Sequence, residues 1–203
     1  ATSKIKLGTA ISSVFVRSAP TLAMAAATVE ELSKGRLILG LGSSHKVQVV
    51  PEHGIEYSKP ILRLTETVKI IRELIKTGSV EFDGETIKIE KFDLWFKPRR
   101  PQIPIYLAGL FPKMVMTCGE IADGIILTRS TLKTADEIQP HLITGSTVAG
   151  KNPKNIDTIK KKIEKVFQGY YVYTWSDLNK SLFSALKVER NVMFIILSLI
   201  IIV

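Results

Sequence analysis

The sequence predicts an α/β fold built around a parallel sheet, and one strand–helix–strand stretch is the main reason. Residues 103–109 form an apolar run that ends in small residues, and residues 124–127 form a second apolar run directly after Asp123. Very short connections join the helical segment between them to both runs, which is typical of a βαβ unit. Since such folds bind ligands at the carboxyl ends of their strands, function is best sought at those ends.

The N-terminal half alternates between predicted strands and helices. Residues 5–11 predict a strand, and residues 20–33 predict a helix because Pro20 suits a first turn and alanines and leucines fill the rest. Residues 36–42 are almost entirely apolar, which predicts a strand buried on both faces. Residues 60–77 place apolar side chains at helical spacing and predict a long helix.

A β-hairpin excursion near residues 78–90 interrupts this alternation. An Asp-Gly pair at 83–84 lies between two runs rich in β-branched and aromatic residues, as in a tight hairpin turn. In the helix before it, Arg63 and Glu66 lie one turn apart, so we expect them to form a weak pair on an exposed surface. A proline-rich connector follows at 97–104.

The C-terminal part continues the alternation with short connections. Residues 133–150 predict a helix that is broken near Gly145. Right-handed crossovers leave two architectures, an open doubly wound sheet or a (β/α) barrel, although the predicted strands are fewer than the eight of a closed barrel. The further segments are a helix at 153–165, an aromatic-rich strand at 166–174, a helix at 177–190 and an apolar end at 192–203.

Composition limits the classes of protein to which this chain can belong. It is 45% hydrophobic and 23% charged, which is typical of a globular domain. Its net charge of +9 suits anionic ligands, but no aromatic residues interleave the lysines of 151–165, so we expect no nucleic-acid partner. The single cysteine, Cys118, excludes a Cys-based zinc site and fits a packed thiol. We expect a cytoplasmic protein without a membrane partner, because no leader is apparent and the apolar end is too short to cross a bilayer.

Candidate functional residues follow the predicted strands. Gly42 and Ser43 would let a flat ligand approach the backbone, but a third glycine and a clear helix start are lacking, so a dinucleotide fingerprint is rejected. His45 is either a catalytic group or an exposed loop histidine, and Ser13 either contacts a cofactor or caps a turn. His53 is expected in a turn, and the widely spaced histidines form no metal site. This scarcity of catalytic side chains favours a redox cofactor held largely by backbone.

Several motifs in order make the chain resemble the bacterial luciferase-like superfamily, whose members use FMN or the deazaflavin F420. The match covers roughly residues 5–157 and is most similar to F420-dependent methylene-tetrahydromethanopterin reductases near its end. The resemblance implies a TIM (β/α)8-type barrel with the flavin at the carboxyl ends of the strands. In this single domain, 1–203, the barrel would be incomplete, because N-terminal βα units of the family are missing and the C-terminal end is short. The matching motifs are Ile5–Ile11, Arg17–Pro20, Glu31–Gly42, Arg63–Glu66, Phe82–Gly84, Pro104–Gly109, Pro112–Met114 and Gly119–Gly124.

The resemblance also implies a cofactor site. Ala10-Ile11 matches a bulge with a non-prolyl cis peptide that backs the ring, and Gly42-Ser43 matches the loop beside the ring. Leu110-Phe111 replaces a Gly-Gly that is common in the segment whose amides meet the cofactor phosphate. Some F420 members have a glutamate acid near the position of His45, which makes His45 the catalytic candidate. The implied cofactor-binding residues are Ala10, Ile11, Ser13, Gly42, Ser43, Ala108, Gly109, Leu110 and Phe111.

The leading hypothesis is therefore an oxidoreductase that transfers hydride between F420 and a small organic substrate. The acidic oligoglutamyl tail of F420 would suit the net charge of +9. Two alternatives stay open: an FMN-dependent luciferase-like monooxygenase, and a shortened flavin-binding protein without catalysis. Because an incomplete barrel exposes strand edges, we expect a homo-oligomer.

Overall fold

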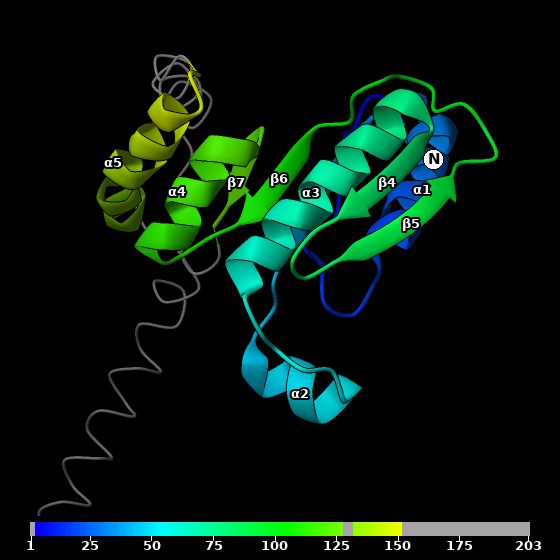
Figure 1. The fold of residues 1–203 in the computed structure, drawn as a ribbon. Coiled ribbons are helices and arrows are strands. Elements are labelled where there is room, and N and C mark those ends of the chain that lie inside the picture. The colour runs from blue at the N-terminus through cyan, green and yellow to red at the C-terminus, as the bar shows by residue number, and fades with distance from the viewer. Residues whose placement is uncertain (1–2, 128–131, 152–203) are drawn as a thin grey trace, which may run out of the picture. The chain divides into compact units, whose positions relative to one another are not determined.

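The computed structural model describes residues 3–127 and 132–151 of the chain. These residues belong to one compact unit, Ala1–Pro153, and form the α/β fold with a parallel sheet that the sequence predicts (Figure 1). The segments predicted beyond residue 151 lie outside the described residues. The elements in chain order are β1 (Leu7–Gly8), β2 (Ser12–Ser13), α1 (Ala19–Leu32), β3 (Leu37–Gly42), α2 (Lys46–His53), α3 (Pro60–Thr77), β4 (Ser79–Asp83), β5 (Lys88–Asp93), β6 (Ile105–Ala108), α4 (Pro112–Ile121), β7 (Gly124–Ile126) and α5 (Leu132–Val148).

The parallel sheet has β3 as an inner strand. The strand order is β1-β3-β6-β7, and β2 pairs with β3 on the same side as β1. Leu41 of β3 pairs with Ser12 on one side and with Leu107 on the other. All of β3 is buried except the half-buried Ile38, so the prediction of a strand covered on both faces is confirmed.

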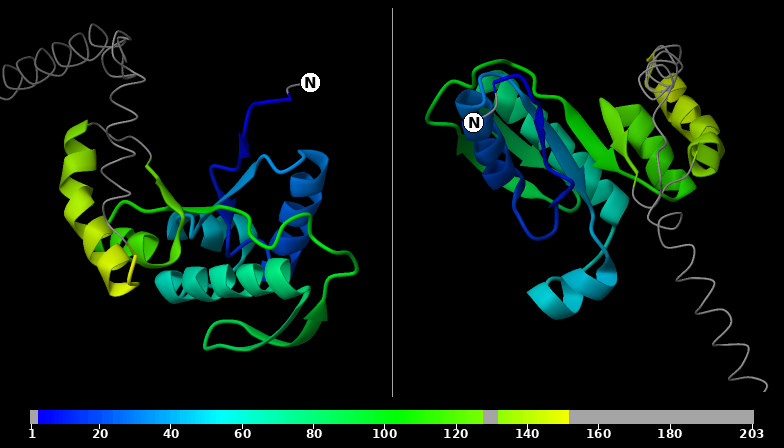
Figure 2. Two further views of the ribbon diagram at one scale, coloured as in Figure 1. Left: turned by 90° about the horizontal axis from the view of Figure 1, so that it is seen from above. Right: turned by 180° about the vertical axis from the view of Figure 1, so that it is seen from behind.

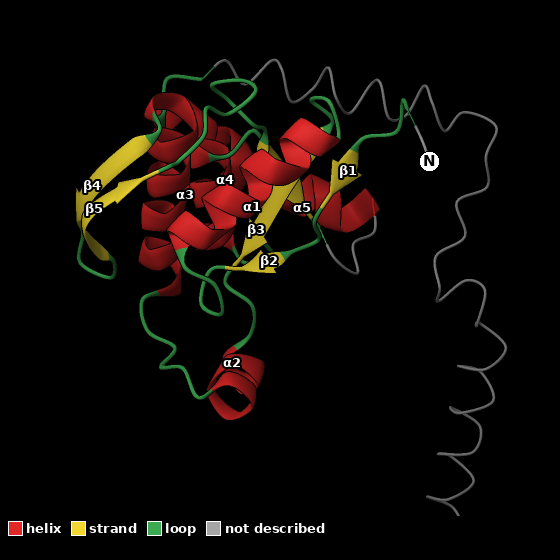
Figure 3. Ribbon diagram, turned by 90° about the vertical axis from the view of Figure 1, so that its right-hand side faces the viewer, coloured by secondary structure: helices red, strands yellow, loops and turns green. Residues whose placement is uncertain are grey.

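The helices α1, α3, α4 and α5 pack side by side in that order. α1 packs against α3 and β3, and α4 packs against α3, α5, β6 and β7 (Figure 3). α3 has the bounds that its periodicity predicts, because its apolar stripe, including Leu64, Ile71 and Leu74, enters the core. The core therefore joins β3 and β6 to α1 and α3, and it fixes the strand ends where a site can form.

The first predicted strand, 5–11, is shorter than expected. Gly8 pairs with Ile38 and Ser12 pairs with Leu41, so this edge holds one residue more than β3 opposite it, as in a β-bulge. The peptide bond between Ala10 and Ile11 inside the bulge is cis, as the family resemblance implies. We call residues 9–11 the bulge from here on.

β4 and β5 form the expected antiparallel hairpin, but Arg63 and Glu66 do not form the expected surface pair. Glu66 is only 5% exposed, and its carboxylate accepts hydrogen bonds from the amides of Glu85 (2.8 Å), Thr86 (3.0 Å) and Ile87 (3.0 Å). Arg63 donates instead to backbone carbonyls. The surface-pair prediction is wrong because the hairpin turn offers Glu66 several backbone amide donors. Together, these charge-assisted hydrogen bonds are more stabilising than one solvated ion pair.

Two helical expectations are also wrong. A helix, α2, begins directly after His45, and His53 is its last residue rather than part of a turn, because the helix ends where Gly54 adopts a φ of 64°. α5 runs unbroken through Gly145. A Cβ on Gly145 would lie 1.9 Å from the carbonyl oxygen of Met116, so this glycine allows α4 and α5 to approach closely instead of ending the helix.

Glu66 gives the fold a dependence on pH. Burial raises the pKa of its carboxyl, but hydrogen bonds from the Thr86 hydroxyl and the three turn amides outweigh burial and hold the pKa below 4.5. A carboxyl with a lowered pKa in the folded state stabilises the fold above its unfolded pKa, and this contribution is lost as the pH falls through the folded pKa.

We therefore predict that Glu66→Gln lowers the free energy of unfolding by about 2 kcal/mol at pH 7. The difference from the unsubstituted protein should shrink as the pH is lowered below 4.5, where Glu66 itself becomes protonated. Urea unfolding at a series of pH values measures both effects. Glu81→Gln on the exposed side of β4 is the control, and an equal deficit for Glu66→Gln at every pH would contradict the assignment.

Candidate functional site

The predicted site residues Ile11, Gly42 and Ala108 meet at the carboxyl edge of the sheet. Gly42 is the last residue of β3, where it pairs with Ser13 of β2. A Cβ added to Gly42 would lie 3.0 Å from Cδ1 of Ile11 and 3.2 Å from Cβ of Ala108. The sheet thus brings together three residues that are far apart in the sequence, and the missing side chain at Gly42 lets Ile11 and Ala108 pack closely against its buried backbone.

Thr9 holds the bulge in place, and the sequence analysis did not single it out. Its hydroxyl donates to the carbonyl oxygen of Gly40 (2.8 Å) and accepts from the amide of Gly40 (2.9 Å). A Cβ on Gly40 would lie 1.8 Å from the carbonyl oxygen of Thr9, so no larger residue fits there. The sequence signal that could have predicted this contact is a threonine at the start of the bulge, opposite a glycine in an otherwise apolar strand.

A hollow of about 520 Å³ lies between the bulge and α2. Its volume lies within the range of small-molecule sites. Arg17, Glu52 and His53 line this hollow, and none of them forms an ion pair with another described residue. Their charged or polar groups are therefore left to solvent. His53 therefore borders the site although the sequence assigned it only to a turn. The lining residues are Thr9, Ile11, Ser12, Ser13, Val16, Arg17, Ser44, Gln48, Val49, Glu52 and His53.

Ser13 and His45 lie at the same edge in different settings. The hydroxyl of Ser13 accepts from the amides of Phe15 (3.3 Å) and Val16 (3.4 Å), which confirms the turn-capping role considered for it. His45 is exposed at the N-cap of α2, and its side chain makes no capping bond. It is not among the residues that line the hollow, although the preceding residue, Ser44, is.

The segment after β6 presents backbone donors. Leu110 and Phe111 are 49% and 73% exposed, and no described residue accepts a hydrogen bond from either amide. Phe111 is the N-cap of α4 with a φ of −89°, an extended conformation that does not require glycine. These amides and the first turn of α4 form the positive end of a helix. Replacement of the family Gly-Gly by Leu110-Phe111 therefore leaves the donors available.

Gly109 and Cys118 pack against each other behind this segment. A Cβ on Gly109 would lie 2.8 Å from Sγ of Cys118, so packing on α4 explains the glycine. The Gly109 amide donates to Ile126 at 3.5 Å. Burial raises the pKa of the Cys118 thiol to about 12, which confirms an unreactive packed thiol. Residues 3–127 and 132–151 contain no cluster of side chains suited to a metal ion and no helix that could cross a membrane.

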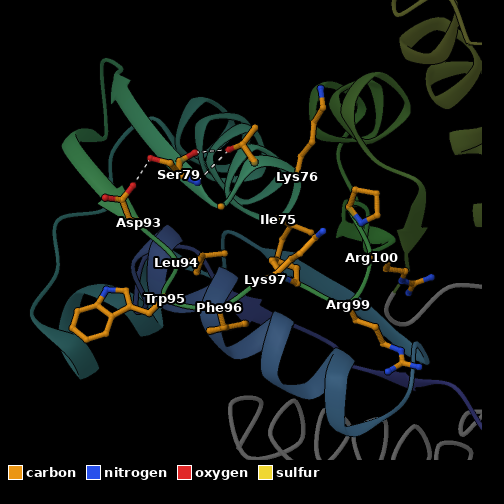
Figure 4. A pocket seen from close by; sticks show the side chains of 14 residues that line it. Ile75, Lys76, Ser79, Asp93, Leu94, Trp95, Phe96, Lys97, Arg99 and Arg100 are labelled. Atoms are coloured by element: carbon orange, nitrogen blue, oxygen red, sulfur yellow. Dashed lines mark hydrogen bonds between the residues drawn. The ribbon is translucent and has the colours of Figure 1, made fainter.

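A second hollow, of about 930 Å³, lies at the amino end of β6 (Figure 4). Its charged groups are largely engaged elsewhere, because Arg99 pairs with Glu31 at 3.1 Å and Arg100 pairs with the buried Glu30. Asp93 accepts from the Ser79 hydroxyl at 2.5 Å. In Figure 4 the side chains around this hollow point in different directions, so it lacks a convergent set of polar groups. The hollow at the carboxyl edge is the stronger candidate.

Comparisons with known proteins identify the family to which the chain is similar. A family model described as luciferase-like monooxygenase matches residues 1–161. A 5,10-methylenetetrahydromethanopterin reductase of Archaeoglobus fulgidus is 35% identical over 158 residues, which are 78% of this chain and 47% of that protein. An F420-dependent glucose-6-phosphate dehydrogenase of Amycolatopsis mediterranei is 30% identical over 169 residues, covering 80% of this chain and 50% of that protein.

A solved structure is similar over the same region. The coenzyme F420-dependent tetrahydromethanopterin reductase from Methanopyrus kandleri matches with a TM-score of 0.66 and 29% identity, covering 74% of this chain and 48% of that one. The chain spans about half the length of the curated relatives it matches. It therefore corresponds to about half of a TIM-type barrel, which confirms the expected fold class. The roles of individual site residues stay predictions.

The bridge between Thr9 and Gly40 can be tested without a ligand. Thr9→Val keeps the shape of the side chain but removes both hydrogen bonds, so we expect the free energy of unfolding to fall by about 2 kcal/mol. Thr9→Ser keeps the hydroxyl and should lose much less. Urea unfolding at neutral pH measures the difference, and equal losses for the two variants would show that the hydroxyl does not hold the bulge.

Proposed function

Because this chain belongs to the luciferase-like monooxygenase family, we propose that it is an F420-dependent oxidoreductase that transfers hydride to or from a small organic molecule. The family and its F420-dependent relatives support an oxidoreductase of this general kind. The observation that supports the cofactor most directly is the meeting of Ile11, Gly42 and Ala108 at one strand edge. The substrates named for the relatives differ, so we propose a substrate class and no single compound.

The residues at the carboxyl edge fit a flat ring. Gly42 is buried, and a Cβ there would lie 3.0 to 3.2 Å from Ile11 and Ala108, so these two side chains pack closely around the end of β3. The bulge supplies an edge against which one face of a ring can lie, and the hollow of about 520 Å³ opens beside it. When bound there, F420 would supply the hydride-carrying ring, while the protein positions that ring and excludes water from one face.

The start of α4 fits the anionic part of such a cofactor. The amides of Leu110 and Phe111 are unoccupied by described acceptors, and Lys113 in the first turn adds a cation at the same end. A phosphate placed here would accept backbone hydrogen bonds at a helix N-terminus. The net charge of +9 would attract an acidic tail further along the molecule.

His45 is the residue to which we assign proton transfer with the substrate. It is exposed at the N-cap of α2, directly after Ser44, which lines the hollow. Glu52 and His53 at the other end of α2 line the hollow itself. His45 and its helix therefore form the substrate side of the proposed site.

Titration of the purified chain with F420 and with FMN tests which cofactor it binds. We predict that F420 binds more tightly than FMN and that high salt weakens F420 binding, since its charged groups are then screened. Gly42→Ala should weaken F420 binding about tenfold, because the added methyl crowds Ile11 and Ala108 and displaces the bulge. Gly8→Ala is the matched control, with ordinary contact at 3.6 Å.

The same titration separates the alternatives. Binding of FMN alone, together with oxygen uptake when reduced FMN is supplied, would replace the F420 assignment with a monooxygenase. A folded chain that binds neither cofactor would support a shortened relative of the family without catalysis.

The role of His45 is tested by turnover. In a panel of small alcohols, aldehydes and sugar phosphates, His45→Gln should lower kcat about 100-fold for whichever compound is turned over. The affinity for F420 should change little, because the side chain does not line the hollow beside the bulge. His141→Gln on α5 is the control, and an unchanged kcat for His45→Gln would remove His45 from the mechanism.

A further inference from the structure

The hollow has walls from the carboxyl ends of two paired strands and from α2. β2 and the turn after it contribute Ser13, Val16 and Arg17, and the loop after β3 contributes Ser44. α2 forms the outer wall and stands apart from the sheet and the other helices (Figures 1 and 2). Val49 is the only residue of α2 that is buried. Packing of α2 alone therefore gives this wall little support, and another contact must set its position.

Tyr57 makes that contact. It lies in the segment that returns from α2 to α3, and its hydroxyl donates to the carbonyl oxygen of Ser44 at 3.2 Å. Ser44 precedes α2, so this hydrogen bond joins the two ends of the segment 44–57 at its base. Ser44 also has a φ of 58°, in the left-handed region that residues with a side chain seldom adopt. A hydrogen bond to its carbonyl thus stabilises an uncommon backbone conformation directly before His45.

Tyr57 is itself fixed by the turn after β2. Its ring stacks on Phe15 with centroids 4.5 Å apart and planes inclined by 21°. Phe15 is 4% exposed, and the guanidinium of Arg63 lies 5.0 Å from the centre of its ring. Arg63 also donates from Nε to the carbonyl oxygen of Val14 at 3.1 Å. Arg63 of α3 therefore fixes the turn after β2, and Phe15 in that turn fixes the ring of Tyr57.

We infer that Tyr57 is a positioning residue of the site: stacked on Phe15 and hydrogen-bonded to Ser44, it couples the bulge side of the hollow to α2 and His45. This inference rests on the proposed function for its effect on ligand binding. Tyr57 acts through Ser44 and does not line the hollow itself. A purely structural role would need only its ring, whereas the positioning role needs its hydroxyl.

Tyr57→Phe in the full chain separates these roles, because it keeps the ring stack and removes one hydrogen bond. Hydrogen exchange is measured first, without ligand. The amides of Gln48 and Val49 donate to the carbonyl oxygen of His45, and their exchange should become about fivefold faster in the variant. Thr28→Val on α1, which also removes one hydroxyl-to-carbonyl bond (2.9 Å), is the matched control and should leave this exchange unchanged.

Binding of F420 is measured next, and the unsubstituted chain is tested before the variants. If it binds, Tyr57→Phe should weaken binding about fivefold with an unchanged thermal midpoint, and Tyr57→Leu should weaken it further. An affinity and an exchange rate equal to those of the unsubstituted chain would overturn the inference. If the unsubstituted chain does not bind F420, the proposed function fails at that step, and the ligand-positioning role of Tyr57 fails with it.

Discussion

The site depends on one close backbone contact, between the carbonyl oxygen of Thr9 and the α-carbon of Gly40. Any side chain at Gly40 would overlap that oxygen, since a Cβ would lie 1.8 Å from it. Because the edge strand can come this close, the Thr9 hydroxyl bridges both backbone groups of Gly40 while the chain leaves the regular ladder. The extra residue of the bulge then brings Ile11 against Gly42. A glycine in the middle of a buried strand thus determines the geometry at its end.

α3 extends this constraint to the rest of the molecule. Glu66 accepts from the hairpin turn, and Arg63, one turn earlier, donates to the carbonyl oxygens of Val14 (3.1 Å) and Thr86 (3.5 Å). One turn of a helix therefore holds both the hairpin and the turn after β2. The hairpin lies outside the parallel sheet, yet its polar contacts end on the same helix that supports the hollow. Removing the hairpin would leave Glu66 buried without its donors, which is costly.

Sequence patterns predicted the elements that depend on local chemistry. The apolar runs of β3 and β6 and the periodicity of α3 are enough to place them, because burial follows directly from those patterns. The family motifs at the strand ends also predicted Ile11, Gly42 and Ala108 as site residues. Partners distant in the chain could not be predicted in this way. Arg63 looked like half of a surface pair because its acceptor, Val14, is brought near only by the fold.

The two sides of the hollow differ in how strongly the fold constrains them. Gly42 is the last residue of β3 and the bulge lies against that strand, whose side chains are in the core, so substitutions at either place disturb core packing. α2 buries only Val49, and its polar residues Gln48, Glu52 and His53 line the hollow from outside. Exposed helix positions tolerate substitution at little cost to stability. Changes on α2 can therefore alter which small molecule fits without altering the side that faces the bulge, provided that Tyr57 still joins the base of the segment to Ser44.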